Sequence, residues 1–334
     1  RTSLALALVT GRSIAIDNIR AGRKDPGLKR QHLTAVNAAA EICGGRVTGA
    51  AVGSRAVTLE PGLVQPGNYH FSVGTAGSAT LVLQTVLPAL LIADGPSTLV
   101  LEGGTHNPWA PPFDFLERVY LPLVERMGPR VSARLERPGF YPQGGGRFVV
   151  SVQPVRELRG FELLERGELV ATQARVLLAN LPRHIGEREV DTVVKKLRWR
   201  RDQCSIDEFA AAGPGNVVSL AVESEHVTEL FTAFGRLGVR AEQVAREAIA
   251  EVNAYLATDA PVGPHLADQL LLPLGISAWQ ARERGDTNGG GSFRTLPLTE
   301  HSTTHIDVLR TILGVQIVVK PATDGTTCTV CFSP

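Results

Sequence analysis

One pattern recurs three times along the chain: an apolar run of helical length, a glycine close to its end, and a short strand rich in β-branched residues. The helical runs and the strands that follow them are residues 4–10 and 13–19, 81–93 and 97–101, and 306–313 and 315–320. One such unit is too small to bury its apolar face alone, whereas stacked units build a common core. We therefore predict three small αβ units packed as one larger domain. The alternative is an accidental likeness, because apolar helices often precede strands.

A different pattern fills the chain between the second and third copies. Its strand-like and helical runs are residues 174–180, 185–198, 216–222 and 240–255. We predict that residues 161–256 form a smaller αβ domain, inserted into a large domain made of residues 1–160 and 257–334. The expected fold class is α+β, built from α/β-type repeats.

The composition is that of a globular protein. Hydrophobic residues make up 43% and charged residues 20% of the 334 residues, which is enough apolar material for a core. No apolar run reaches the roughly 18 residues of a membrane-spanning helix, so we expect no membrane partner. Four cysteines are too few for a disulfide framework in so long a chain, which favours a cytoplasmic location.

A basic segment lies in the first part of the chain, where residues 1–60 hold nine Lys and Arg against four Asp and Glu. Residues 20–32 contain five of these cations, a Pro-Gly turn and a Gln-His pair that opens a helix. Arginine forks bind phosphate oxygens in pairs, and a helix N-terminus adds N–H donors. The segment indicates a polyphosphate or nucleic-acid site, with a solvated basic loop as the alternative.

Three further strings are rich in glycine or proline. Residues 72–78 place glycines and hydroxyls before an apolar helix, which suits either a bound anion or a tight turn. Residues 103–112 form a proline-rich wall that could stack on a base or serve only as a rigid connection. Residues 138–146 end in three consecutive glycines, whose ordering costs conformational entropy. That cost indicates close approach by a ligand or another chain segment, unless the string is a flexible hairpin tip.

Polar residues within two of the apolar helices are candidates for chemistry. Gln84 lies in the second apolar run, where a buried amide needs either a structural partner or a ligand. His301 and His305 open the third run, beside N-cap residue types at 302–304. An imidazole near helix N–H donors can meet a phosphate, or it can attack phosphorus and form a phosphoramidate. The alternative is a purely structural histidine at a helix cap.

A zinc site is a further interpretation of the same histidines, which are spaced i and i+4 and could join Cys328 and Cys331. Residues 326–332 alternate like a strand, which turns the two thiols to opposite faces. No glycine knuckle is present either, so the pattern disfavours zinc.

Taken in chain order, these strings resemble the RNA 3′-terminal phosphate cyclases. The likeness covers nearly the whole chain, and its most characteristic string is the Gly-x-x-Pro-x-Gly-Gly-Gly of residues 139–146. The other matching strings are residues 19–33, 76–78, 81–88, 103–112, 181–184, 213–216, 266–269 and 301–305. The resemblance implies a large domain of three αβ repeats, like the C-terminal domain of a translation initiation factor, with a thioredoxin-like αβ domain inserted.

The resemblance also implies a reaction. An RNA with a 3′-phosphate end is converted to a 2′,3′-cyclic phosphodiester, with ATP and a divalent metal, Mg²⁺ or Mn²⁺. A histidine takes AMP from ATP and releases pyrophosphate, the AMP passes to the RNA phosphate, and the 2′-hydroxyl then expels AMP. A bare phosphate monoester is a poor electrophile, and adenylation supplies its leaving group.

Single residues match the functional positions of the family. His305 matches the nucleophile, and Arg1 matches an arginine beside it that stabilises phosphoryl charge. Asp268 is the candidate for contact with a metal or a ribose. The residues matching the ATP-binding positions are Arg20, Arg23, Gln31, His32, Gln84, Pro111, His265, Leu266, Ala267, Asp268 and Gln269.

Some positions depart from the family. His265 stands where the family usually has Tyr, Pro138 replaces a basic residue, and residues 276–290 look like an extension. Family members carry a strand and a Gly-rich loop with a Glu before the position of Arg1, and we expect a chain with that segment to be adenylated faster. The alternatives are a non-catalytic cyclase-like protein of ribosome assembly, which lacks the nucleophilic histidine, and an enolpyruvyl transferase, which the Gly-rich strings do not suggest.

Overall fold

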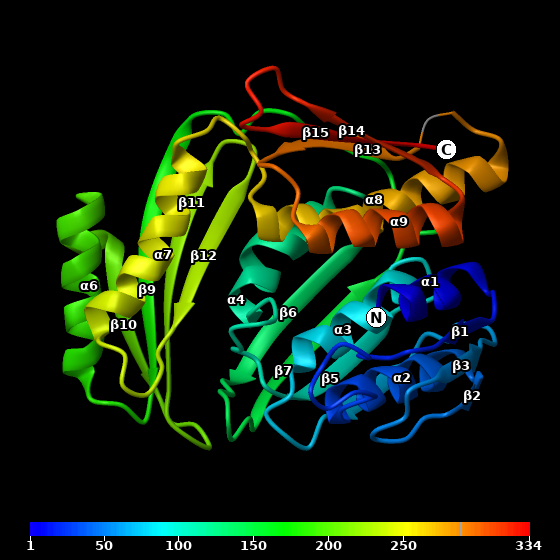
Figure 1. Cartoon of the computed structure of the whole chain (residues 1–334), viewed down its shortest axis with the longest axis horizontal. Helices are drawn as coiled ribbons and strands as arrows, with labels where there is room; N and C mark the ends of the chain where they lie inside the picture. Colours follow the sequence, from blue (N-terminus) through cyan, green and yellow to red (C-terminus); the bar gives the residue numbers. More distant parts are fainter. Residues whose placement is uncertain (288) are drawn as a thin grey trace.

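The computed structural model describes residues 1–287 and 289–334, and the strands of this part of the chain form four small sheets with helices packed against them (Figure 1). The mixed α+β class predicted from the sequence is confirmed. Each sheet combines strands that are distant in the sequence with strands that are adjacent in it.

The first half of the chain supplies two sheets. The first has the order β1-β3-β2 and is antiparallel throughout, and the second has the order β4-β5-β7-β6, in which β4 and β5 are parallel. The strands are β1 (Ile14–Ile16), β2 (Arg46–Thr48), β3 (Val57–Glu60), β4 (Asn68–Ser72), β5 (Ser97–Gly103), β6 (Arg130–Arg137) and β7 (Gly146–Gln153). The helical segments are α1 (Thr2–Thr10), α2 (Arg30–Cys43), α3 (Ala79–Leu90), α4 (Phe113–Phe115), a π-helical turn (Leu116–Tyr120) and α5 (Leu121–Glu125).

The second half supplies the other two sheets, with the orders β10-β9-β11-β12 and β14-β15-β13-β8. The strands are β8 (Phe161–Leu163), β9 (Leu169–Ala179), β10 (Cys204–Phe209), β11 (Gly215–Ser224), β12 (Thr228–Phe234), β13 (Gly291–Thr295), β14 (Gln316–Pro321) and β15 (Cys328–Ser333). The helices are α6 (Arg183–Leu197), a 3₁₀ turn (Arg201–Gln203), α7 (Ala241–Leu256), α8 (Pro264–Arg284) and α9 (Glu300–Leu313). Strand β8 pairs in parallel with β13, so the sheet of the predicted insert begins only at β9.

All three copies of the recurring pattern form a helix followed by a strand, each in a different sheet: α1 and β1, α3 and β5, and α9 and β14. Glycine ends two of the helices, because Gly11 and Gly314 adopt the left-handed conformation at φ 68° and 66°. That the units descend from one repeat stays a prediction.

The start of α9 differs from the prediction. Thr299 is the N-cap, and its side chain accepts a hydrogen bond from the amide of Ser302. The cap is therefore not within residues 302–304, and His305 lies more than one turn inside the helix. Any role for His305 depends on side chains that face it rather than on free N–H groups of the first turn.

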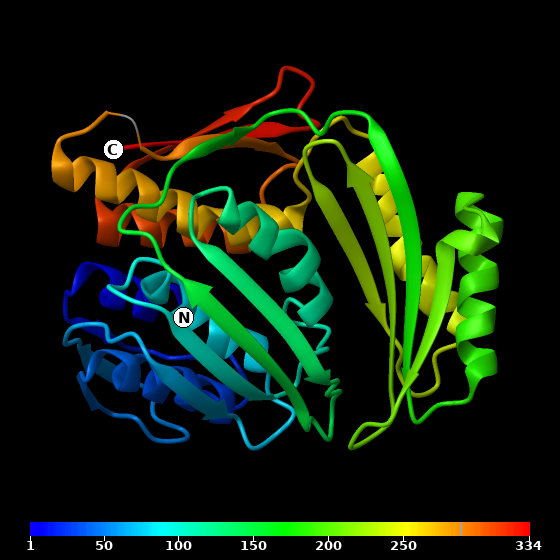
Figure 2. The ribbon, with the colours of Figure 1, turned by 180° about the vertical axis from the view of Figure 1, so that it is seen from behind.

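The apolar side chains separate into two main clusters. One runs through all three copies of the pattern, from Leu4 of α1 to Phe332 of β15, and the other fills the space between β9–β12 and helices α6 and α7. Figure 2 shows these two helices and their sheet set to one side of the remaining elements. A small third cluster around Phe140 and Val217 joins the loop before β7 to this sheet.

Backbone packing explains the glycines of residues 139–146. A methyl group on Gly139 would lie 2.3 Å from the amide nitrogen of Gly146 and 2.5 Å from the carbonyl oxygen of Gly103. A methyl group on Gly144, at φ 71°, would lie 2.7 Å from Cα of Ala76. Of the alternatives left by the sequence, close approach of other chain segments accounts for this string, and the string is not a free hairpin tip.

Gly139→Ala should therefore destabilise the fold by about 2 kcal/mol or more, because the added methyl has only backbone atoms to displace. Gly22→Ala is the matched control, since nothing lies within 4 Å of a methyl group placed there and neither glycine needs a positive φ. Urea denaturation of both variants measures the difference. Equal midpoints for the two variants would refute the packing explanation.

The run at 276–290 is largely helical. Its residues up to Arg284 continue α8, and Gly285 ends the helix in the left-handed conformation. Residue 288 of this run lies outside the described residues. Among the helices that the structure describes, none is both long enough and apolar enough to cross a membrane.

Candidate active site

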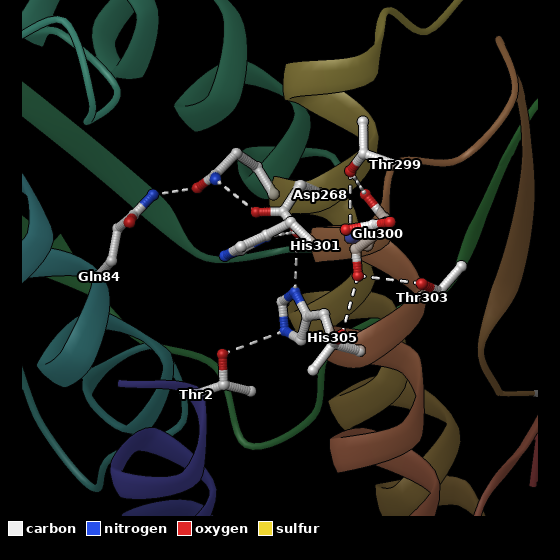
Figure 3. A network of polar contacts seen from close by, with 11 residues as sticks. Thr2, Gln84, Asp268, Thr299, Glu300, His301, Thr303 and His305 are labelled. Atoms are coloured by element: carbon white, nitrogen blue, oxygen red, sulfur yellow. Dashed lines mark hydrogen bonds and ion pairs between the residues drawn. The ribbon is translucent and has the colours of Figure 1, made fainter. Parts of the chain in front are cut away.

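Helices α1, α3, α8 and α9 converge on a small pocket of about 50 Å³. Figure 3 shows this region, with Thr2 at the start of α1 facing His305 on α9, and Gln84 approaching from α3. The residues lining the pocket are Arg1, Thr2, Gln84, Tyr120, Asp268, Gln269, Leu272, His301 and His305. Chain segments more than 300 residues apart thus meet at one point.

A larger hollow of about 580 Å³ lies elsewhere, on α7 and the loop before it. Its lining includes Arg188 and Glu242, which pair with each other at 2.8 Å, and it contains no histidine, cysteine or hydroxyl side chain. The smaller pocket is therefore the candidate for chemistry, because it gathers two imidazoles and a carboxylate.

Asp268 holds both histidines of α9. Its Oδ1 lies 2.7 Å from Nδ1 of His301 and 3.3 Å from Nδ1 of His305 (Figure 3). His301 is 68% exposed, whereas only 9% of the His305 side chain is exposed. The i, i+4 spacing read from the sequence does put both rings on one face of the helix, where they meet a carboxylate from α8.

The contacts of His305 select its tautomer. With Asp268 as acceptor, Nδ1 carries the proton, and Nε2 keeps its lone pair. The hydroxyl of Thr2 lies 3.3 Å from Nε2 and can donate to it. His305 therefore presents a largely buried nitrogen lone pair beside Arg1 and Thr2, which is what a histidine nucleophile requires.

Hydrogen bonds from the two histidines keep Asp268 ionised despite its burial. Burial would raise the pKa of its carboxyl, but the hydrogen bonds from His301 and His305 outweigh burial and hold the pKa well below the ordinary value. The hydrogen bond between His301 and Asp268 also raises the pKa of His301. At neutral pH the pocket thus contains a carboxylate that can stabilise positive charge on either ring.

The side-chain amides of two glutamines connect α3 to the carboxylate of Asp268 through hydrogen bonds. Nε2 of Gln84 donates to Oε1 of Gln269, and Nε2 of Gln269 lies 3.3 Å from Oδ2 of Asp268 (Figure 3). Gln84 also lines the pocket. The two roles considered for Gln84 from the sequence, hydrogen bonding within the protein and facing a ligand site, are thus compatible.

The basic segment lies close to Arg1. Burial, together with the nearby charges of Arg20 and Arg1, lowers the pKa of His32 to about 4. His32 is neutral at pH 7, and its Nδ1 accepts a hydrogen bond from the amide of Lys29 at 3.0 Å. Arg20 donates to the carbonyl groups of Asp25 and Gly27 and so holds its own loop.

Comparison with known proteins shows the family of this chain. The family model for RNA 3′-terminal phosphate cyclases matches residues 1–319. A protein of Koribacter versatilis named RNA 3′-terminal phosphate cyclase is 49% identical over 321 residues, which cover 96% of this chain and 87% of that protein. The chain belongs to the RNA 3′-terminal phosphate cyclase family. A protein of the same name from Pseudomonas fluorescens is 48% identical over 327 residues, 97% of this chain and 92% of its own.

In this cyclase-family chain, five of the residues that the resemblance assigned to functional positions line the pocket together: Arg1, Gln84, Asp268, Gln269 and His305. Leu266 and Ala267 do not, because both are fully buried in the core. His265 is exposed and lies within electrostatic range of Glu251 on α7.

The remaining sequence candidates lie around the pocket. Gln31 lines a third hollow, at the N-terminal end of α3, where its Oε1 accepts a hydrogen bond from the amide of Ser78 at 3.0 Å. Pro111 is half-buried in the loop after β5, outside the lining of either hollow. The side chain of Arg23 has no hydrogen-bond or ion-pair partner among the described residues, so it is available to a ligand.

Four pocket residues were not proposed for the site from the resemblance: Thr2, Tyr120, Leu272 and His301. Leu272 follows Asp268 by one helical turn, so helical spacing could have indicated it. Nothing in the sequence around Tyr120 indicates its place at the pocket, because a π-helical turn carries it there.

The donor set does not fit a resident metal ion. Among residues 1–287 and 289–334, no group of three or more His, Cys, Asp or Glu side chains is arranged to hold one, which includes the zinc ligands considered from the sequence. Both oxygens of Asp268 accept hydrogen bonds, from the two histidines and from Gln269. We therefore derive no step through a protein-bound metal.

Proposed function

We propose that this chain converts an RNA 3′-phosphate to a 2′,3′-cyclic phosphodiester with ATP, through an AMP adduct on Nε2 of His305. One observation carries the proposal: His305 is buried with its Nδ1 on the ionised Asp268 and its Nε2 beside Thr2 and Arg1. Membership of the cyclase family supports the same reaction.

The first step follows from this geometry. The lone pair of Nε2 attacks the α-phosphorus of ATP, a P–N bond forms, and the bond to the β-phosphate oxygen breaks with release of pyrophosphate. The imidazole becomes positively charged, and Asp268 stabilises that charge through Nδ1–H. Arg1, which lines the same pocket, is proposed to stabilise the negative charge that develops on the phosphoryl oxygens.

Two further transfers complete the reaction. An oxygen of the RNA 3′-phosphate attacks the phosphorus of the AMP adduct, and the P–N bond breaks with its electrons returning to Nε2. The 2′-hydroxyl then attacks the activated 3′-phosphorus, loses its proton, and expels AMP. Protein-bound AMP thus ends as free AMP, and one ATP is converted to AMP and pyrophosphate for each cyclic end.

The basic segment is proposed to hold phosphates rather than to read bases. Arg23→Ala should slow RNA cyclisation by about ten- to a hundredfold, whatever the terminal base, because charge-assisted phosphate contacts are worth roughly 1.5–3 kcal/mol. Arg20→Ala should have a similar effect, part of it through the loop that Arg20 holds. Initial rates on 3′-phosphorylated oligonucleotides with four different terminal bases measure the effect.

Arg46→Ala is the control for these variants. Arg46 lies in the same sheet unit, is exposed, and pairs with Glu60 at 2.8 Å, so its loss should change the rate little. A loss on Arg23→Ala that depends strongly on the terminal base would contradict the proposal.

The main competing function is that of a non-catalytic cyclase-like protein. The resemblance assigns a nucleophilic histidine to the enzymes alone, and here that position is His305 in a buried, hydrogen-bonded setting. Incubation with ATP labelled at the α-phosphate, with Mg²⁺ or Mn²⁺ and no RNA, decides between them, since only the enzyme keeps the label on protein.

We also propose that residues 161–256 form an inserted domain and that the protein works in the cytoplasm. A cluster of apolar side chains between β9–β12 and helices α6 and α7 supports the inserted unit. All four cysteines are free, which is consistent with a reducing compartment.

A further inference from the structure

A third hollow, distinct from the pocket of His305 and from the hollow on α7, lies at the N-terminal end of α3 and has a volume of about 330 Å³. Three loops form it: residues 72–78, 103–112 and 138–146, which are the Gly- and Pro-rich strings of the sequence. Its volume is at the lower end of the range of small-ligand sites. None of the functions derived above uses it.

The lining of this hollow carries no ionisable acid or base other than a phenol. Its polar side chains are the amides and hydroxyls of Gln31, Thr75, Ser78, Asn107 and Tyr141. A phosphate would find no cation here, whereas sugar hydroxyls and base edges pair with neutral amides and hydroxyls. The Nε2 of Gln31 is available for this, because only its Oε1 has a partner among the described residues.

Two aromatic side chains stand exposed at the hollow. Trp109 is 85% exposed and Tyr141 is 68% exposed, and neither ring packs on another ring of the described chain. Bases stack readily on such rings, and the contact tolerates any base because every base has a π-face. Two exposed rings at one hollow therefore favour a nucleobase as the occupant.

Buried contacts hold the loops that carry both rings. His106 stacks on Phe140 with ring centroids 5.3 Å apart, and the two residues form a β-bridge. His106 is also held at 2.7 Å by the buried Asp114, which in turn pairs with Arg175 of β9. Trp109 and Tyr141 thus project from loops that are fixed by buried contacts, so little ordering is needed when a ligand binds.

The hollow adjoins the pocket of His305. Leu81 lines the hollow and Gln84 lines the pocket, one turn apart on the same face of α3. On the other side, Gln31 precedes His32, which lies within electrostatic range of Arg20 and Arg1. A ligand in the hollow can therefore place a phosphate toward the arginines while its base remains in neutral surroundings.

We infer that this hollow binds the 3′-terminal nucleoside of the RNA, with its base stacked on Trp109 or Tyr141 and its 3′-phosphate directed to the basic segment and His305. The inference rests on the proposed function for the identity of the substrate. Under this inference, the protein recognises the RNA end by stacking on its terminal base, whichever base that is.

Direct binding tests the inference. Trp109→Ala and Tyr141→Ala should each weaken the binding of a labelled 3′-phosphorylated oligoribonucleotide by about tenfold or more, as measured by fluorescence anisotropy at fixed salt. Trp109→Phe and Tyr141→Phe keep a stacking face and should stay within about threefold of the wild type. Leu63→Ala, at another exposed apolar residue, is the control and should bind normally.

The rate of AMP–His305 formation without RNA separates this inference from the proposed function. Alanine variants that bind RNA as tightly as the wild type would overturn the inference, as would a wild-type chain that does not bind the oligonucleotide. Variants that raise the KM for ATP in the absence of RNA would also overturn it, by assigning the hollow to the adenine of ATP. A wild-type chain that forms no adduct refutes the proposed function, while the binding comparison still decides the role of the hollow.

Discussion

Replacing His305 with alanine should abolish the AMP–protein adduct. The variant lacks the largely buried imidazole whose Nδ1 contacts Asp268 and whose Nε2 faces Thr2, so labelling by α-labelled ATP should fall by at least about a thousandfold. The wild-type adduct should be labile to acid and stable to alkali, as phosphoramidates are. Gel autoradiography, followed by peptide mapping of the labelled site, measures both properties.

His301→Ala is the matched control for this prediction. It removes the other imidazole bound to Asp268 but leaves the bond from His305, so adduct formation should fall no more than about tenfold. An adduct that persists unchanged in His305→Ala, or that maps to His301, would reject His305 as the nucleophile.

Asp268→Asn should slow adduct formation by about a hundred- to ten-thousandfold. An asparagine can present its NH₂ group to Nδ1, which favours the wrong tautomer of His305 and removes the charge that stabilises the imidazolium. Binding of ATP itself should change far less than the rate, because the loss acts through His305. Single-turnover adduct formation across a range of ATP concentrations separates the two quantities.

Two comparisons sharpen the test at Asp268. Asp307→Asn alters an exposed carboxylate on the helix of His305, outside the pocket, and should leave the rate unchanged. Raising Mg²⁺ or Mn²⁺ should not restore Asp268→Asn. Recovery at high metal would mean that Asp268 binds a metal ion rather than orienting the histidine.

Local sequence patterns predicted most of the elements because they depend on neighbours in the chain. The spacing of apolar residues gave α7 and α9, and the glycine after each terminal run marked the ends of α1 and α9. The N-cap of α9 was misplaced because several residues there have capping side chains, and only the bond from Ser302 to Thr299 selects one.

The Gly-rich strings show what local sequence patterns could not predict. Three consecutive glycines required close approach, but the sequence did not tell whether a ligand or the backbone approaches. Gly139 and Gly144 face Gly146 and Ala76, so backbone fills the space beside them. The surface that we infer to bind a ligand lies two residues after Gly139, on the side chain of Tyr141.

The sequence by itself determined the class of fold, the family, and the identity of His305 as candidate nucleophile, since each is written in local spacing and motif. Only the tertiary structure decided which polar residues act together. Asp268 reaches His305 because α8 and α9 pack side by side, and Leu266 of the same motif turns into the core instead. Contacts between residues so distant in the chain depend on how whole helices pack, and that packing is set by the shape of the shared core rather than by any single segment.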